Sequence, residues 1–195
     1  MEAEIRTIGD KVDAGRRLSE EDALALYRSR DLVSVGEMAD IANRRKNGDR
    51  VYFIVNRHIN HTNICVTRCQ FCAFSRTKGE PLAYTMTMDE VLRRADEARA
   101  QKATELHIVG GLHPDRPFDF FLVLLRTLRE RYPEMHLQAF TAVEIDYFSK
   151  IAGLPLDEVI RRMKEAGLGS LPGGGAEIFA PEIRNRICPE KISGD

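Results

Sequence analysis

Apolar positions in the first fifty residues follow helical spacing behind two capping signals. Ser19 with Asp22, and Ser34 with Glu37, each place a hydroxyl three residues ahead of an acidic side chain. This pairing is typical of a helix N-terminus, where the hydroxyl accepts a hydrogen bond from an unpaired backbone N–H. We therefore expect two short helices, which form a helical preface over residues 1–50.

The rest of the chain alternates between strand-like apolar runs and helical patterns, after a polar stretch at 43–50 that predicts a solvated loop. The expected strands are 51–55, 57–64, 104–109, 135–140 and 168–171, and the expected helices are 118–132, 156–166, 181–187 and about fourteen residues after the Thr87 and Glu90 capping box. Parallel neighbours need a crossover connection, so this order predicts an α/β protein with a parallel sheet.

The alternation amounts to about four βα units after the preface. Four parallel strands form only part of a closed barrel and leave an exposed edge. The sequence carries no terminating signal at 192–195. We therefore expect residues 51–195 to be the N-terminal part of a larger core domain, truncated at its C-terminus.

Composition and charge narrow the class of protein. Hydrophobic residues make up 43% of the chain and charged residues 30%, as in globular proteins that bury a core. Lys and Arg number 29 against 30 Asp and Glu and are spread along the chain, which argues against nucleic acid as a partner. The longest apolar run, 120–125, is far shorter than the roughly 20 residues of a membrane-spanning helix. We expect a cytoplasmic protein with no membrane span.

Three of the cysteines, Cys65, Cys69 and Cys72, stand in a CxxxCxxC run directly after a predicted strand. Thiolates on one short loop can converge on a metal centre, and they select zinc or iron–sulfur clusters. A structural zinc site usually takes four protein ligands, whereas the remaining cysteine, Cys188, lies far along the chain. The spacing therefore favours a four-iron cluster with one open iron. A zinc-binding loop, an iron–sulfur electron-transfer module and unligated buried thiols remain the alternatives.

Two motifs point to a family. The CxxxCxxC run, with the aromatic Phe71 before its last cysteine, resembles the signature of the radical S-adenosylmethionine (radical SAM) superfamily. Gly110 and Gly111, after the next predicted strand, resemble that superfamily's two-glycine motif. The resemblance implies a partial TIM-type (β/α) barrel and a [4Fe–4S] cluster whose metal ligands are the three cysteines. It also implies S-adenosylmethionine at the open iron, with its methionine end against the two glycines.

Longer segments narrow the resemblance. Those that resemble the aminodeoxyfutalosine synthase family are NRHINHTNICVTRCQFCAFSR at 56–76, HIVGGLHPD at 107–115, AFTAVEID at 139–146 and SLPGGGAEI at 170–178. The resemblance implies a transferase of menaquinone biosynthesis. Such an enzyme adds the 5′-deoxyadenosyl radical of its co-substrate S-adenosylmethionine to 3-[(1-carboxyvinyl)oxy]benzoate, with loss of carbon dioxide, and forms 6-amino-6-deoxyfutalosine. A reducing protein such as flavodoxin or ferredoxin is the implied partner, and relatives of the dehypoxanthine futalosine cyclase and deazaflavin-cofactor synthase types remain the alternatives.

The same resemblance implies further cofactor-binding residues. Phe71 would lie near the adenine, unless it is a core aromatic. Glu144, which we expect to end the third strand, would contact the ribose or amino group, unless it is a carboxylate held at a helix start by the helix dipole. Gly173, Gly174 and Gly175 would cradle an anionic or ribose group, unless they form only a turn.

A substrate with two carboxylates requires cationic or donor groups near the cluster. The groups within reach in the sequence are Arg57, His58, His61, Asn63, Arg76 and His113. His58 and His61 have opposite parity on a strand, so at most one of them can point into the barrel. These two histidines are our candidate substrate contacts, and no catalytic residue is assigned.

Overall fold

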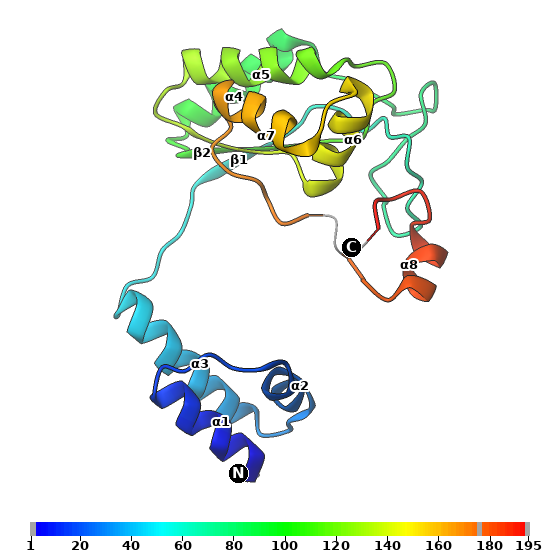
Figure 1. Cartoon of the computed structure of the whole chain (residues 1–195). Coiled ribbons are helices and arrows are strands. Elements are labelled where there is room, and N and C mark those ends of the chain that lie inside the picture. Colours follow the sequence, from blue (N-terminus) through cyan, green and yellow to red (C-terminus); the bar gives the residue numbers. More distant parts are fainter. Residues whose placement is uncertain (1–2, 175–176, 194–195) are drawn as a thin grey trace. The chain divides into compact units, whose positions relative to one another are not determined.

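The computed structural model describes residues 3–174 and 177–193. The chain divides into two compact units, Met1–Phe53 and Ile54–Asp195, which are drawn in Figure 1. The helices of the first unit are α1 (Ala3–Asp13), α2 (Glu20–Arg28) and α3 (Leu32–Asn47). Its buried apolar cluster consists of Ile5, Ile8, Val12 and Met38. Each unit thus has its own core, because a second cluster forms within Ile54–Asp195.

One of the two capping signals is confirmed. Ser19 Oγ accepts from the Asp22 N–H, and the Asp22 carboxylate accepts from the Ser19 N–H, so the capping box of α2 is complete. The second prediction is wrong. Asp31 caps α3 by accepting from the Ser34 N–H, so Ser34 lies inside the first turn rather than before it.

The solvated loop predicted at 43–50 is also wrong for most of its length. Helix α3 continues to Asn47 and ends at Gly48, whose φ of 64° suits glycine. Arginine and lysine are good helix formers, which explains why this charged stretch stays helical. Helix α1 was not predicted, because no serine, threonine or aspartate precedes it to signal a cap.

The second unit contains a parallel sheet of three strands in the order β1 (Asn56–Asn60), β2 (Glu105–Val109) and β3 (His136–Ala139). Its helices are α4 (Met88–Ala100), α5 (Phe118–Arg131), α6 (Ala142–Ala152), α7 (Leu156–Glu165) and α8 (Pro181–Ile187). Helices α4 to α7 pack on one another, and Figure 1 shows them gathered on one side of the sheet. The α/β class with a parallel sheet is confirmed.

Strand β2 shows how the sequence separates the two faces of the sheet. Leu106 and Ile108 are fully buried in the main apolar cluster, together with Leu124 and Leu125 of α5. The alternate residues point the other way, as the pleat requires, and Val109 lines a pocket there. The helices therefore cover one face, and the carboxyl ends of the strands open onto the pocket.

Two predicted strands did not form. Within 51–55, Val51 is 90% and Phe53 84% exposed, and the sheet begins only at Asn56. Apolar β-branched residues favour a strand when neighbours cover them, and in this segment no such cover exists among the described residues. The 168–171 segment makes one isolated parallel bridge, between Ser170 and Gln138, so the sheet has three strands rather than four in the described part of the chain.

Helix α6 was missed, although its signal is present in the sequence. Thr141 and Glu144 form a complete capping box at its start. Glu144 was expected to end the third strand, but it lies in the first turn of α6 because β3 stops at Ala139. The chain turns sharply between strand and helix at Phe140, which has a φ of 62°.

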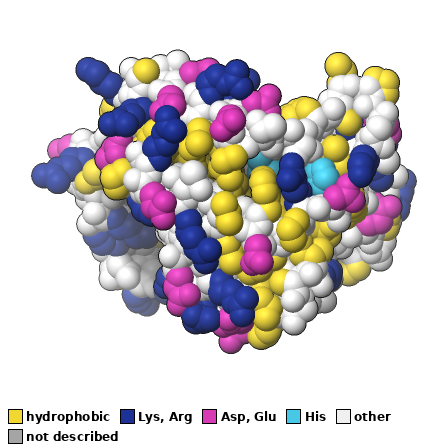
Figure 2. All heavy atoms as spheres, turned by 90° about the horizontal axis from the view of Figure 1, so that it is seen from above, with side chains coloured by type: hydrophobic (Ala, Val, Ile, Leu, Met, Phe, Trp, Pro, Cys, Tyr) yellow, Lys and Arg dark blue, Asp and Glu magenta, His cyan; other side chains and the backbone are white. Residues whose placement is uncertain are grey.

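The surface is mixed in charge. On the face drawn in Figure 2, basic and acidic side chains are interspersed among hydrophobic ones. Within 3–174 and 177–193, the structure has no helix whose length and apolar character would suit a bilayer crossing.

Candidate functional site

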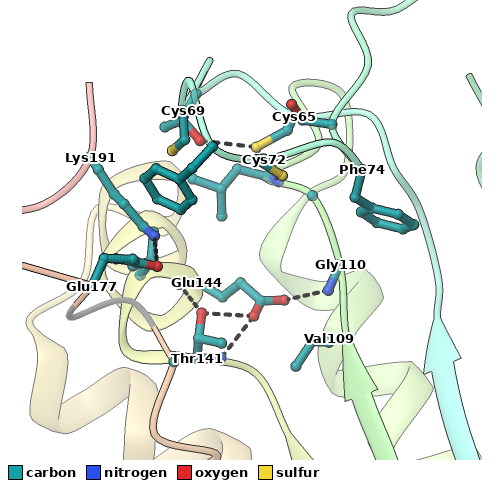
Figure 3. Close-up of a pocket in the computed structure, with 17 residues that line it drawn as sticks. Cys65, Cys69, Cys72, Phe74, Val109, Gly110, Thr141, Glu144, Glu177 and Lys191 are labelled. Atoms are coloured by element: carbon teal, nitrogen blue, oxygen red, sulfur yellow. Dashed lines mark hydrogen bonds and ion pairs between the residues drawn. The ribbon is translucent and has the colours of Figure 1, made fainter. Parts of the chain in front are cut away.

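A pocket lies where the loop after β1 meets the carboxyl ends of β2 and β3. Cys65, Cys69 and Cys72 all line this pocket, which is open to solvent and has a volume of about 270 Å³. Figure 3 shows the cysteine loop on one side of the pocket, with Thr141 and Glu144 facing it from the other. The CxxxCxxC spacing therefore brings all three thiols to one cavity.

The chain already holds the Cys65 sulfur with polar groups. Its Sγ accepts from the Leu112 N–H at 3.3 Å and lies 3.0 Å from Thr67 Oγ1. The Cys72 N–H donates to the Cys69 carbonyl at 3.0 Å and closes the turn between them. The Leu112 N–H thus places a hydrogen-bond donor beside a sulfur that could bind metal.

The three thiols are not closed around a common point. Among the described residues, no group of three cysteine, histidine or acidic side chains has the arrangement of a finished metal site. The donor set is nevertheless suited to one kind of centre, because three soft sulfurs from one loop line a single cavity. These residues fit a [4Fe–4S] cluster with an open iron better than a zinc site, which would need a fourth protein ligand.

Cys69 has a distinct electrostatic environment. Burial raises the pKa of its thiol, and the nearby Lys191 ammonium and the Thr67 hydroxyl lower that pKa in part. Lys191 is the single cation among the described residues that line the pocket. Burial thus outweighs the lysine at Cys69, and a metal bound beside this sulfur would favour its thiolate.

The two glycines after β2 allow two very close approaches. A Cβ on Gly110 would lie 2.6 Å from His61 Nε2, and a Cβ on Gly111 would lie 2.2 Å from the Ile64 carbonyl oxygen. The Gly111 N–H also donates to the Thr62 carbonyl at 2.9 Å. The glycine pair thus fixes the end of β2 against the segment that leads into the cysteine loop.

Glu144 is a buried carboxylate in the pocket wall. It is 3% exposed. Its Oε1 accepts from the Gly110 N–H at 3.1 Å, while its Oε2 accepts from the Thr141 N–H at 2.7 Å and from Thr141 Oγ1 at 2.9 Å. Glu144 therefore caps the start of α6 and also lines the pocket. A role at the helix start and a role in ligand binding do not exclude each other.

The two candidate histidines lie in different environments. His58, in β1, is exposed and stacks on His107 with ring centroids 4.4 Å apart. His61, one residue beyond β1, is 2% exposed, and its Nε2 has no hydrogen-bond partner among the described residues. The described lining of the cysteine pocket includes neither histidine.

The expected glycine cradle is partly at the pocket. Gly174 lines it, and a Cβ there would lie 2.6 Å from Thr141 Cγ2. Gly173 has nothing within 4 Å of an added Cβ, and Gly175 lies outside the described residues. Phe71 lines the pocket, but it is 48% exposed and is not a core aromatic.

The segment after the glycine run folds back onto the cysteine loop. The Glu190 carboxylate accepts from the Arg68 N–H at 2.7 Å, and the Ile187 carbonyl accepts from the Gln70 N–H at 2.8 Å. Lys191 reaches into the pocket, where it pairs with Glu177 at 2.5 Å, and its Nζ lies 5.5 Å from the Phe71 ring centroid. We call residues 187–191 the clasp, because they bind the cysteine loop at two points. One point, at Arg68, lies between the first two cysteines, and the other, at Gln70, lies between the last two.

The other sequence candidates support loops and helices. Arg57 pairs with Glu97 at 2.9 Å, and Asn63 uses its amide to bind the backbone of a neighbouring loop. Arg76 donates to two backbone carbonyls close by in the chain. His113 Nδ1 accepts a backbone N–H at 3.1 Å, and burial lowers its pKa.

Lys191 and Thr141 are among the pocket residues that sequence reasoning missed. Lys191 is far from the cysteines in the chain, so only the folded clasp reveals it. Thr141, which holds Glu144, could have been found from its capping box, since a threonine three residues before a glutamate is a local signal.

Comparison with known proteins decides the family. The sequence profile described as the Radical SAM superfamily matches residues 59–193, which is more than half of the chain. The chain belongs to the radical SAM superfamily. Enzymes of this superfamily use a [4Fe–4S] cluster and S-adenosylmethionine.

Several curated relatives of this radical SAM chain are similar over nearly its whole length. It is 45% identical to the aminodeoxyfutalosine synthase of Thermus thermophilus over 96% of the chain and 50% of the relative. It is 46% identical to that of Streptomyces coelicolor over 95% of the chain and 48% of the relative. A 5-amino-6-(D-ribitylamino)uracil–L-tyrosine 4-hydroxyphenyl transferase of Methanopyrus kandleri is 44% identical over 88% of the chain and 46% of the relative. The chain spans about half the length of these relatives.

Solved structures confirm the fold of the radical SAM chain. The [FeFe]-hydrogenase maturase HydG superposes with a TM-score of 0.75 over 98% of this chain and 41% of that chain, at 19% identity. Methylornithine synthase superposes with a TM-score of 0.57 over 82% of this chain and 56% of that chain, at 17% identity. At such low identity the likeness concerns the fold alone, and the expected partial (β/α) barrel is confirmed.

Proposed function

We propose that the chain carries the cofactor-binding part of an aminodeoxyfutalosine synthase. Residues 51–195 would form the N-terminal part of the barrel, and residues 1–50 the helical preface. The observation that carries the proposal is the convergence of the three cysteines, the two glycines after β2 and Glu144 on one pocket. The identity to two synthases, 45% and 46% over nearly all of the chain, supports this activity within the superfamily.

With a [4Fe–4S] cluster and S-adenosylmethionine bound, the site would be equipped for two steps. The sulfonium would be cleaved reductively, and the 5′-deoxyadenosyl group would be added to 3-[(1-carboxyvinyl)oxy]benzoate, with loss of carbon dioxide and formation of 6-amino-6-deoxyfutalosine. Cys65, Cys69 and Cys72 would be the protein ligands. The Leu112 N–H, which already donates to Cys65 Sγ, would stabilise negative charge on that sulfur. Lys191 would offset part of the thiolate charge from the clasp side.

The pocket wall opposite the cysteines would hold S-adenosylmethionine. Glu144 offers a carboxylate that the Gly110 and Thr141 N–H groups keep in one orientation, which suits an amino or hydroxyl group of the ligand. Phe71 and Phe74 both line the pocket and would exclude water from the bound adenosine. Of the predicted cradle of Gly173, Gly174 and Gly175, Gly174 lines the pocket and would bring its backbone N–H to the ligand.

The proposed reductant is a small electron-transfer protein such as flavodoxin or ferredoxin, which agrees with a cytoplasmic location. The candidate substrate contacts remain His58 and His61. Since neither lines the pocket in this structure, they would act from the sheet or from behind the pocket wall.

A second candidate function is favoured by the relative that is 44% identical and is named a 5-amino-6-(D-ribitylamino)uracil–L-tyrosine 4-hydroxyphenyl transferase. The two activities consume different substrates. In the synthase the adenosyl group is retained in the product, so S-adenosylmethionine is a co-substrate. A 4-hydroxyphenyl transfer would leave 5′-deoxyadenosine as a separate product.

Product analysis tests the proposal. The protein is reconstituted anaerobically with iron and sulfide, reduced with dithionite or flavodoxin, and incubated with S-adenosylmethionine and either 3-[(1-carboxyvinyl)oxy]benzoate or the uracil and tyrosine pair. We expect mass spectrometry to find 6-amino-6-deoxyfutalosine in the first mixture and no coupled product in the second. The reverse result would replace the synthase with the transferase. A protein that binds zinc and no four-iron cluster would overturn both.

A further inference from the structure

His61 carries a buried nitrogen without a partner. The side chain is 2% exposed, and Nε2 makes no hydrogen bond within the described part of the molecule. Phe121 and Phe140 pack steeply against the ring, with centroids 5.6 and 6.2 Å away. Burying a polar nitrogen among aromatic rings is unfavourable unless a partner forms in some state of the protein, so this atom requires an explanation.

The nitrogen faces the junction of the three strand ends. His61 follows β1 directly, Gly110 follows β2 directly, and Glu144 lies in the first turn after β3. His61 Nε2 is 3.9 Å from Glu144 Oε1, and a Cβ on Gly110 would lie 2.6 Å from the same nitrogen. The absence of a side chain at Gly110 therefore leaves the line between the histidine and the carboxylate open.

Glu144 has an acceptor site for this donor. Its Oε2 accepts from the backbone N–H and the hydroxyl of Thr141, whereas its Oε1 accepts from the Gly110 N–H. A carboxylate oxygen can accept two hydrogen bonds, and a carboxylate only accepts, so the histidine would donate from Nε2–H. The present gap of 3.9 Å exceeds a hydrogen bond by about 1 Å, so the His61 ring would have to turn toward the carboxylate to donate.

We propose that His61 is a positioning residue, which donates from Nε2 to Glu144 Oε1 when S-adenosylmethionine occupies the pocket. The inference rests on the proposed function, because it takes Glu144 as a contact of that ligand. Glu144 is already held by its three hydrogen bonds, so the change on binding would be a turn of the His61 ring toward this carboxylate. His61 thus contributes to affinity for S-adenosylmethionine although it does not line the pocket.

Three variants of the reconstituted protein test the proposal. His61→Leu has a similar volume without a donor, His61→Gln restores an amide donor, and Glu144→Gln removes the anionic acceptor. The dissociation constant for S-adenosylmethionine is measured by equilibrium dialysis, iron and sulfide content by colorimetry, and the unfolding midpoint of the cluster-free protein by urea titration.

We expect His61→Leu to weaken S-adenosylmethionine binding about tenfold with iron content unchanged, and His61→Gln to stay within about threefold of the unmodified protein. His61→Leu should leave the unfolding midpoint unchanged or raise it, because it removes an unpaired polar atom from an aromatic environment. In the Glu144→Gln background, His61→Leu should cost no further affinity. A purely structural histidine would lower stability and affinity together and would not be rescued by glutamine.

Two results would overturn the inference while leaving the proposed function intact: unchanged affinity in His61→Leu, or an equal loss of affinity with and without the Glu144 carboxylate. Should His61→Leu fail to fold, His61→Met, which also lacks a donor, takes its place in the same cycle. If the unmodified, cluster-loaded protein does not bind S-adenosylmethionine at all, the proposed function fails instead.

Discussion

The carbonyl oxygen of Ile64 lies 2.2 Å from the position that a Cβ on Gly111 would occupy. Both groups belong to backbone, since Ile64 enters the cysteine loop and Gly111 leaves β2. Backbone atoms cannot swing aside as the end of a flexible side chain can. This single approach therefore ties the position of Cys65 to the end of the neighbouring strand.

Replacing Gly111 by alanine should separate the strand from the loop. We expect Gly111→Ala to lower the free energy of unfolding by about 1–3 kcal/mol, as overpacking does, and to reduce the iron bound on reconstitution. Urea unfolding and iron analysis measure the two effects. Gly36→Ala is the matched control, because Gly36 lies in α3 with nothing within 4 Å of an added Cβ. That variant should gain roughly 0.5–1 kcal/mol of stability from the helix interior.

Each of the three loop cysteines should be needed for the cluster. We expect Cys69→Ala to lose the visible absorption and the electron paramagnetic resonance signal of a four-iron centre, because it removes one of three protein ligands. Cys188→Ala is the control, since Cys188 is buried and does not line the pocket in the described structure. If Cys188→Ala lost the cluster as well, a four-cysteine site would have to replace the open-iron arrangement.

A comparison of two equivalent capping boxes distinguishes an effect on helix stability from an effect on ligand binding. Thr87 caps α4 and Thr141 caps α6 with the same pair of reciprocal hydrogen bonds, but only Thr141 also holds Glu144 in the pocket. Replacing either threonine by alanine should cost about 1 kcal/mol of unfolding free energy. Thr141→Ala alone should weaken S-adenosylmethionine binding, which equilibrium dialysis detects. Equal affinities in the two variants would argue against a role of Glu144 in the ligand site.

Stability should fall at alkaline pH through Tyr132. The Tyr132 hydroxyl is fully buried and donates to Asp96 Oδ1 at 2.7 Å. Burial and this carboxylate raise the pKa of Tyr132 from 10.0 to about 12. Because the pKa of Tyr132 is higher in the folded than in the unfolded state, the protonated hydroxyl contributes its full stabilisation below pH 10. This contribution to the free energy of unfolding is lost as the pH rises from about 10 to 12.

The loss would amount to about 2–3 kcal/mol. Tyr132→Phe should be less stable than the unmodified protein near neutral pH, because Asp96 loses a donor, and it should lack this part of the alkaline decline. Urea unfolding at several pH values between 8 and 11.5 gives the comparison. Parallel curves for the two proteins would show that another group governs the decline.

Short-range chemistry was predictable from the sequence. The capping boxes of α2 and α4 involve residues three positions apart, so their signals do not depend on tertiary structure. The same holds for the CxxxCxxC spacing, which places three thiols on one loop whatever surrounds it. The strand–helix alternation was enough to predict the parallel sheet, because crossover connections allow few other arrangements of the strands.

The errors arose where distant parts of the chain decide the outcome. Segment 51–55 has strand-forming residues but lacks covering neighbours among the described residues, so β1 begins after it. Lys191 and the partnerless nitrogen of His61 are visible only once the clasp and the three strand ends are in place. No periodicity or spacing encodes such relationships.

The clasp has a consequence for the order of events during synthesis. The Arg68 and Gln70 amides, which lie between the first and last cysteines, find their acceptors on Glu190 and Ile187, more than a hundred residues later. A ribosome makes the metal-binding loop long before it makes the residues that tether it. We therefore expect iron inserted into a nascent chain to be held loosely, and cluster assembly to become secure only after residue 190 has left the ribosome.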